Sequence, residues 1–172
     1  MIITIPGTPT PQARMRLSRW GVFDPCAFCK KNIREFLTKN FKSPLVENPH
    51  ISFIFQMPIP VSTSKKVIAE MSRGTIRHRK KPDIDNLVKL YLDCLDGIVF
   101  EQDQTATLGM CIKLYHPEPK TIIHISQKDR SLQPFDILEI LDAFHDVSEC
   151  GISTSSELLS LLGFDAHGLQ SL

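Results

Sequence analysis

Apolar residues recur with the period of an α-helix between Pro82 and Gly97. They fall at i, i+3, i+4, i+7, i+8 and i+11, which places all of them on one side of a helix. Asp83 favours the start of this helix because its side chain can cap an orphan backbone N–H, and Gly97 favours its end. The pattern therefore predicts a helix that buries one face against a core. The residues on that face are Ile84, Leu87, Val88, Tyr91, Leu92 and Leu95.

Short runs of alternating apolar and polar residues predict β-strands before and after this helix. These runs cover residues 1–5, 51–57, 108–114 and 121–126. The last two runs are separated only by a turn at residues 116–119, so we expect them to pair as a β-hairpin.

Two further helices are expected in the N-terminal half of the chain. The first is capped at Asp24 and runs to about Phe41, and the second begins after residue 62 or 63 and ends before Gly74. Residues 7–21 are expected to form a loop. Strands and helices in this order predict an α+β fold. The buried side of the first helix is expected to hold Phe28, Ile33, Phe36 and Leu37.

A chain of 172 residues with 42% apolar content can bury one substantial core. No apolar run approaches the roughly 20 residues of a membrane-spanning helix, and the N-terminus lacks the features of a signal peptide. We therefore expect a cytoplasmic protein that does not enter a membrane. The five cysteines are an odd number, and the pair Cys26 and Cys29 lacks the second pair that a zinc site needs. Free thiols are expected.

Charge is distributed unevenly along the sequence, although the formal net charge is only +1. Residues 1–89 contain sixteen Lys and Arg and six Asp and Glu, whereas residues 90–172 contain four and thirteen. A basic N-terminal half favours an anionic partner such as nucleic acid. The alternative is a solvated basic surface without such a partner.

Three carboxylates and a lysine are the candidate functional residues. Asp83 and Asp85 lie one residue apart at the start of the predicted helix, and Lys89 follows one turn later. Asp103 lies in the next segment and can join them only if its loop folds back. Carboxylate oxygens suit Mg²⁺, so the group predicts metal-dependent cleavage of a phosphodiester. The structural alternative is a helix cap at Asp83 beside a surface ion pair of Asp85 with Lys89, worth roughly 0.3–0.5 kcal/mol.

The run K-K-P-D-I-D-N-L-V-K at residues 80–89, followed by residues up to 104 and a strand ending in Lys113, resembles the RusA family of Holliday-junction resolvases. The likeness extends upstream to residues 7–25 and 57–66, and it covers roughly residues 1–126. This resemblance implies a Mg²⁺-dependent endonuclease that acts in DNA recombination and repair.

Position by position, Asp83, Asp85 and Asp103 match the metal-binding acids of that family, and Lys89 matches its catalytic lysine. The chain departs from the family at Gln102, where an aspartate usually precedes the one matched by Asp103. An amide oxygen can coordinate a metal but brings no charge. We expect activity to survive if Asp103 is the essential member of the two.

The resemblance also implies a small mixed β-sheet flanked by helices for residues 1–126. It further implies Mg²⁺ as the cofactor, with Mn²⁺ as a possible substitute, and a four-way DNA junction as the partner. A homodimer is expected because resolving a junction takes two symmetric nicks, and a two-fold dimer supplies two sites. Basic side chains in loops and helix ends are expected to hold the DNA backbone. They are Arg14, Arg16, Lys65, Lys66, Arg79, Lys80 and Lys81.

Residues 127–172 form a separate extension in this interpretation. The pattern of residues 134–147 predicts an amphipathic helix, and a capping box precedes a second short helix at residues 158–162. Residues 126–172 contain two basic and eight acidic side chains, so contact with phosphate is disfavoured. We expect either a docking or oligomerisation appendage or a loosely attached tail.

Two other functions compete with the resolvase. The chain could be a non-catalytic protein that binds branched DNA and whose metal site has degenerated at Gln102. It could also be a nuclease that acts on RNA or on DNA flaps. His78, beside the predicted site, could carry a proton, although an ordinary loop histidine is the simpler explanation.

Overall fold

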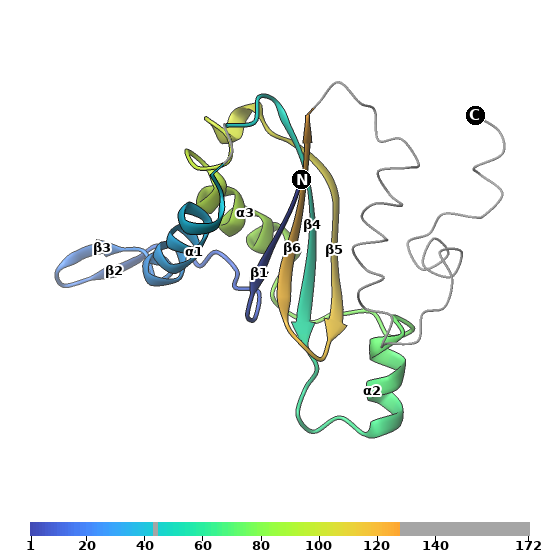
Figure 1. Cartoon of the computed structure of the whole chain (residues 1–172). Helices are drawn as coiled ribbons and strands as arrows, with labels where there is room; N and C mark the ends of the chain where they lie inside the picture. The colour runs from blue at the N-terminus through green and yellow to red at the C-terminus, as the bar shows by residue number, and fades with distance from the viewer. Residues whose placement is uncertain (43–44, 128–172) are drawn as a thin grey trace.

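The computed structural model describes residues 1–42 and 45–127. Its strands are β1 (Ile2–Pro6), β2 (Arg16–Ser18), β3 (Gly21–Phe23), β4 (Pro49–Pro58), β5 (Thr107–His116) and β6 (Lys120–Gln127). Its helices are α1 (Ala27–Asn40), α2 (Lys65–Ser72), α3 (Ile84–Leu95) and the short 3-10 helix η1 (Asp103–Thr105). Figure 1 shows α1 and α3 on one side of the main sheet and the β2–β3 hairpin standing away from it.

The main sheet has four strands in the order β1-β6-β4-β5. β4 runs parallel to β5, whereas β6 is antiparallel to both β1 and β4. The sheet is therefore mixed, and the expected α+β class with a small mixed sheet flanked by helices is confirmed. The helices expected at residues 134–147 and 158–162 lie outside the described residues, and the boundary at residue 126 stays a prediction.

The expected β-hairpin between residues 108–114 and 121–126 is wrong. β4 lies between these two strands, so Ile54 pairs with Ile112 on one side and with Ile122 on the other. Almost every residue of β4 is buried, which suits an interior position, whereas β5 is only partly buried and forms the edge. The short connection between β5 and β6 therefore crosses the end of β4, a distance of two strand spacings or about 9.6 Å.

The first helix begins slightly later than expected, and its buried side differs at one position. Cys26 is its N-terminal cap, and the Cys26 N–H donates to Asp24 Oδ1 at 2.8 Å. Ile33 and Leu37 are buried as expected, but Phe28 is 77% exposed. The segment expected to be a loop contains the two-stranded hairpin of β2 and β3.

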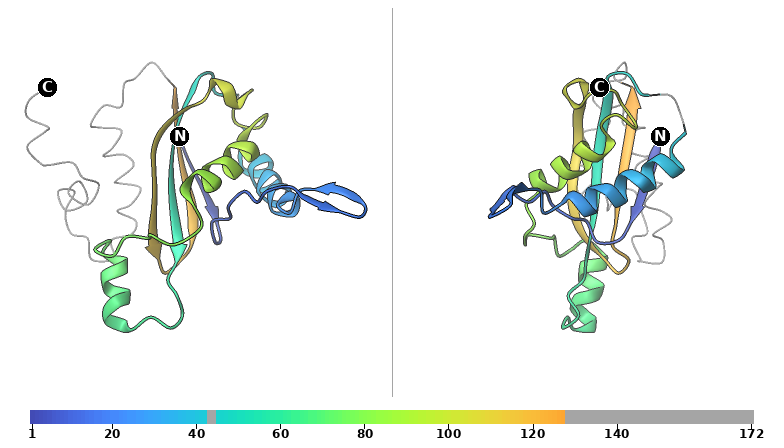
Figure 2. Two further views of the ribbon diagram at one scale, coloured as in Figure 1. Left: turned by 180° about the vertical axis from the view of Figure 1, so that it is seen from behind. Right: turned by 90° about the vertical axis from the view of Figure 1, so that its left-hand side faces the viewer.

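Helix α3 supplies one side of the main core and packs on the face of β4 that holds its aromatic residues. Phe53 and Phe55 are fully buried, with ring centroids 5.6 Å apart, and Phe55 contacts Tyr91 of α3 at the same centroid distance. Figure 2 shows α3 lying between the sheet and α1. The side chains of α3 that are at most 3% exposed are Leu87, Leu90, Tyr91, Cys94 and Leu95.

Polar contacts from α1 hold the C-terminal half of α3. The Lys30 ammonium contacts Asp93 at 2.8 Å and Asp24 at 3.2 Å. Burial alone would lower the pKa of Lys30, but its hydrogen bonds to the two carboxylates outweigh burial and raise that pKa. Arg34 Nη1 donates to the carbonyl oxygens of Asp93 at 3.1 Å and Asp96 at 2.9 Å. Arg34 thus satisfies acceptors that a helix end leaves without partners.

Within the described part of the chain, no helix combines the length and the apolar character needed to cross a membrane.

Replacing Arg34 should loosen the end of α3. We expect Arg34→Met to lower the free energy of unfolding by about 2 kcal/mol, because it removes a charged donor from partly buried carbonyls. Lys31→Met is the matched control, since Lys31 lies on the same helix, is exposed and forms a surface ion pair with Glu35 at 3.8 Å. Its effect should stay within about 0.5 kcal/mol. Equal effects of the two substitutions in urea denaturation would contradict the capping role.

Candidate active site

The two carboxylates at the start of α3, Asp83 and Asp85, do not cap the helix. The Asp83 carbonyl oxygen accepts the Leu87 N–H at 3.3 Å, but the Asp83 side chain makes no capping hydrogen bond. Asp85 accepts only a long contact of 3.5 Å from the Asn86 side-chain amide. Both carboxylates are exposed, and they lie at the helix end whose backbone N–H groups and dipole favour negative charge. They are available to a ligand.

Lys89 lies one turn after Asp85 and is exposed. Among the described residues it forms no ion pair within 4.0 Å, so it is not neutralised by Asp85. Asp93, the next polar residue on this side of the helix, is held by Lys30. The structure therefore does not support a surface ion pair between Asp85 and Lys89 as the explanation of the motif.

Asp103 lies near the opposite end of α3 from the other two acids. It begins η1, which follows the C-terminus of α3, as both Figure 1 and Figure 2 show. The 12 residues of α3 separate the two ends by about 18 Å. The loop does not fold back toward Asp83. In the described residues, no three His, Cys, Asp or Glu side chains come together closely enough to hold a metal ion.

Gln102 is exposed beside Asp103, and its side-chain oxygen accepts a hydrogen bond from the Gln104 amide. The Thr105 hydroxyl also donates to the Gln102 carbonyl oxygen at 2.7 Å. The amide at position 102 is thus part of the local turn.

Lys113 anchors the loop that carries the acids. Its Nζ donates from β5 to the carbonyl oxygens of Lys80 at 3.0 Å and Pro82 at 2.5 Å. His78 in the same loop packs against Tyr115, with the two ring planes tilted by 53° and the ring centroids 4.6 Å apart. Burial, and then the nearby charge of Lys113, lower the pKa of His78. Its contact with Tyr115 helps to attach the loop to β5.

The N-terminal segment also reaches the start of α3. The Gln12 N–H donates to the Asn86 carbonyl oxygen at 2.7 Å. This bond places the residues that lead into the hairpin, including Arg14, beside the turn that carries Asp85. Arg14 and Arg16 are exposed there.

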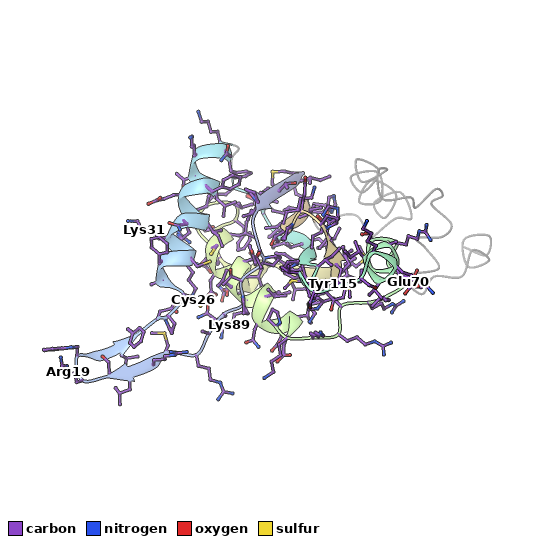
Figure 3. All side chains as sticks on the ribbon, turned by 90° about the horizontal axis from the view of Figure 1, so that it is seen from below. Arg19, Cys26, Lys31, Glu70, Lys89 and Tyr115 are labelled. Carbon is purple, nitrogen blue, oxygen red and sulfur yellow. The ribbon has the colours of Figure 1, made fainter. Side chains whose placement is uncertain are left out.

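The other basic residues of the prediction lie in two places, and all of them are exposed. Arg79, Lys80 and Lys81 directly precede Asp83 and share its surroundings. Lys65 and Lys66 form the first turn of α2, which lies beyond the end of the sheet in Figure 1. Figure 3 shows Lys89 on α3 and Glu70 on α2 well apart when the molecule is seen from below. The structure brings the first group to the acids, but α2 stands apart from them.

Two positioning contacts were not predicted from the sequence. Lys113 was placed on one face of its strand, but nothing in the pattern indicates that its ammonium binds loop carbonyls. The Cys26 thiol likewise serves the local structure, because Sγ accepts the Ala13 N–H at 3.2 Å and donates to the Pro11 carbonyl oxygen at 3.5 Å. A lysine on a strand that is otherwise partly buried was the available signal for the first contact.

Exposed carboxylates at a helix start, an unpaired lysine one turn later and adjacent loop cations are typical of proteins that process a nucleic-acid backbone. The family model of the endodeoxyribonuclease RusA matches residues 6–126. The chain therefore belongs to the RusA family of Holliday-junction endonucleases, and the resemblance noted from its motifs is confirmed.

A curated protein of Bacillus subtilis (strain 168), the uncharacterized protein YqaN, is similar to this chain. The two are 26% identical over 133 residues, which cover 72% of this chain and 94% of that protein. No solved structure matches the chain significantly.

Removing the Lys113 ammonium should release the loop before α3. We expect Lys113→Met to speed limited trypsin cleavage after Arg79 and Lys80 by about tenfold, because two carbonyls lose a charged donor. Lys120→Met on β6 is the control, since Lys120 is also partly buried and its register partners are Pro6 of β1 and Gln56 of β4. Unchanged cleavage in Lys113→Met would show that the loop is held by other contacts.

Proposed function

We propose that the protein is a divalent-metal-dependent endonuclease that resolves four-way DNA junctions by paired nicks. The observation that supports this most directly is the state of Asp83 and Asp85. Among residues 1–42 and 45–127, neither carboxylate is used for a helix cap or an ion pair, and both are exposed next to Lys89 and the Arg79–Lys81 run. Family membership supports the nuclease activity in general.

The donor set fits Mg²⁺, with Mn²⁺ as a substitute. In the described part of the chain, Asp83 and Asp85 offer hard carboxylate oxygens that no helix cap or ion pair occupies, and Mg²⁺ usually binds one or two carboxylates and retains several waters. When bound, the ion supplies charge stabilisation at the scissile phosphate and activates a water molecule. One chain contributes only two of the three predicted acids at this end of α3.

The protein's own side chains orient the DNA and balance its charge. The Lys89 ammonium acts as a compact positive charge toward the phosphate that is cut. Arg79, Lys80 and Lys81 contact flanking phosphates and set the register of the backbone. Lys113 fixes the carbonyls on either side of Lys81, so these cations and Asp83 move as one unit.

A homodimer is proposed on a structural ground besides the need for two nicks. Asp103 is about a helix length from Asp83 and Asp85 in its own chain, so it cannot share their metal ion. A two-fold partner that packs with α3 antiparallel would bring its own Asp103 to the first chain's Asp83. Each of the two sites would then take acids from both copies, and a monomer would have no complete site.

The competing function is a protein that binds branched DNA without cutting it. Gln102 is the residue that favours it, because its amide replaces a carboxylate that the family usually has. A protein of this kind would bind junctions equally well in EDTA and would yield no product. Cleavage of RNA or of DNA flaps is a further alternative. The cleavage assay described below tests it when RNA or a flap replaces the four-way junction as the substrate.

Cleavage of a labelled four-way junction tests the proposed activity. We expect paired symmetric nicks with Mg²⁺ and no product with EDTA. Asp85→Asn should lower the rate at least about 100-fold, because it removes a charged metal ligand. Linear duplex of the same sequence is the substrate control. If the protein binds the junction but does not nick it with any divalent cation, the proposed nuclease activity is refuted. The non-catalytic protein that binds branched DNA is then the supported function.

Subunit mixing tests whether each site uses acids from two chains. Asp85→Asn and Asp103→Asn copies are co-expressed with different tags and purified through both tags. We expect each homodimer to be inactive and the mixed dimer to nick one strand, because one of its two sites keeps all of its acids.

The matched control is a mixed dimer of Asp83→Asn and Asp85→Asn. Both of its sites lose a ligand under either arrangement, so it should be inactive. An inactive mixed dimer of Asp85→Asn and Asp103→Asn would indicate that each site lies within one chain. Failure to recover any protein through both tags would refute the dimer.

A further inference from the structure

The β2–β3 hairpin is an exposed arm with an unusual composition. Figure 3 shows it standing out from the body of the molecule with Arg19 at its outer end. Trp20 at the tip is 84% exposed and Leu17 is 82% exposed, although burial of such side chains is normally favourable. No acidic residue occurs in the sequence before Asp24. The large apolar side chains exposed on or next to the arm are Met15, Leu17, Trp20, Val22 and Phe23.

The tip of the arm is ordered by its own contacts. Arg19 and Trp20 form a two-residue turn between Ser18 and Gly21, which pair across the hairpin. The Ser18 hydroxyl donates to the Gly21 carbonyl oxygen at 3.0 Å and accepts the Trp20 N–H at 3.2 Å. Gly21 has φ +118°, a left-handed conformation that favours glycine. The Arg19 guanidinium lies 4.8 Å from the Trp20 ring centroid. The aromatic ring is therefore held in a defined position and remains largely exposed.

The root of the arm is tied to the start of α3. Gln12 is bonded to Asn86, which is next to Asp85, and Ala13 is bonded to Cys26 at the start of α1. Seven residues of nearly extended chain from Arg14 to Trp20 reach about 23 Å from this root. The root of the arm therefore lies beside the turn that carries Asp85, and the length of the arm exceeds the roughly 12 Å width of the major groove.

Charge decides which class of partner fits the arm. Arg14, Arg16 and Arg19 make it basic, so two arms would repel each other, and a polyanion complements them. Arginines alone would suit the backbone of any duplex. The exposed Trp20 and Leu17 gain nothing from phosphates, and they require an apolar surface. The faces of bases provide one, but a continuous duplex stacks them against each other. They become accessible where strands branch.

We propose that Trp20 stacks on a base pair at the branch point of the DNA, with the arginines of the arm on the adjacent phosphates. Apolar side chains inserted at a base step unstack it and bend the helix. The arm would thereby select branched DNA over duplex and hold the junction open, while its root keeps the backbone at Asp83 and Asp85. This inference rests on the proposed function, since it concerns the same substrate.

Trp20 is the chain's only tryptophan, so its fluorescence reports on the arm alone. We expect a four-way junction to quench this fluorescence in EDTA, and a linear duplex of the same sequence to leave it nearly unchanged. In the reciprocal measurement, 2-aminopurine at the branch point should brighten with the native protein but not with Trp20→Ala. Trp20→Ala should weaken junction affinity about tenfold, and Trp20→Phe should retain most of it.

Phe28→Ala is the matched control, because Phe28 is an exposed aromatic residue outside the hairpin and should be neutral. The inference is overturned if a junction that is bound and nicked leaves the fluorescence of Trp20 unchanged, and the proposed function then stands. It is also overturned if Trp20→Ala converts a dimer into monomers in sedimentation, because the arm would then bind a second copy. Failure to bind any branched DNA would overturn both proposals.

Discussion

The burial of one face of α3 is the constraint on which the rest of the structure depends. Leu87, Leu90 and Leu95 are completely buried against the sheet, which fixes the rotation of the helix about its axis. The side chains of Asp85 and Lys89, on the opposite side of the helix, therefore face solvent. Contacts from α1 through Lys30 and Arg34 prevent the helix from sliding along the sheet. The orientation of the polar side of α3 is therefore set by the packing of its core side.

The supports of the candidate site come from segments far apart in the sequence. The N-terminal segment bonds to Asn86, and Lys113 bonds to the loop before Asp83. Both contacts use backbone carbonyls, so they position the chain without occupying the carboxylates. This division leaves the acids free for a ligand and still limits their movement, which is what a site needs for a defined coordination geometry. Asp103 lies at the start of η1, beyond the C-terminal end of α3, and its side chain is exposed.

The sequence predicted the parts of this arrangement that depend on local periodicity. The helix at residues 84–95 was predicted correctly because its apolar residues fit only the helical period. The pairing of β5 with β6 was predicted wrongly because a short connection favours neighbours, whereas the two apolar faces of β4 require the interior position. The arm was predicted as a loop because its strands are three residues each and bury nothing. The place of Asp103 depends on the path of a loop, on which periodicity carries no information.

The interior position of β6 has a consequence for how the protein is made. β6 is the last strand of the described chain, yet it lies between β1 and β4 and is the only strand in this sheet that β1 pairs with. Met1 and Ile125, which are 124 residues apart in the sequence, exchange two backbone hydrogen bonds of 2.8 Å. During synthesis β1 emerges well before β6, its partner in this sheet, and cannot form this pairing until Gln127 has left the ribosome. β1 must therefore wait for its sheet partner while α1, β4 and α3 are made, and the sheet closes in a late, non-local step.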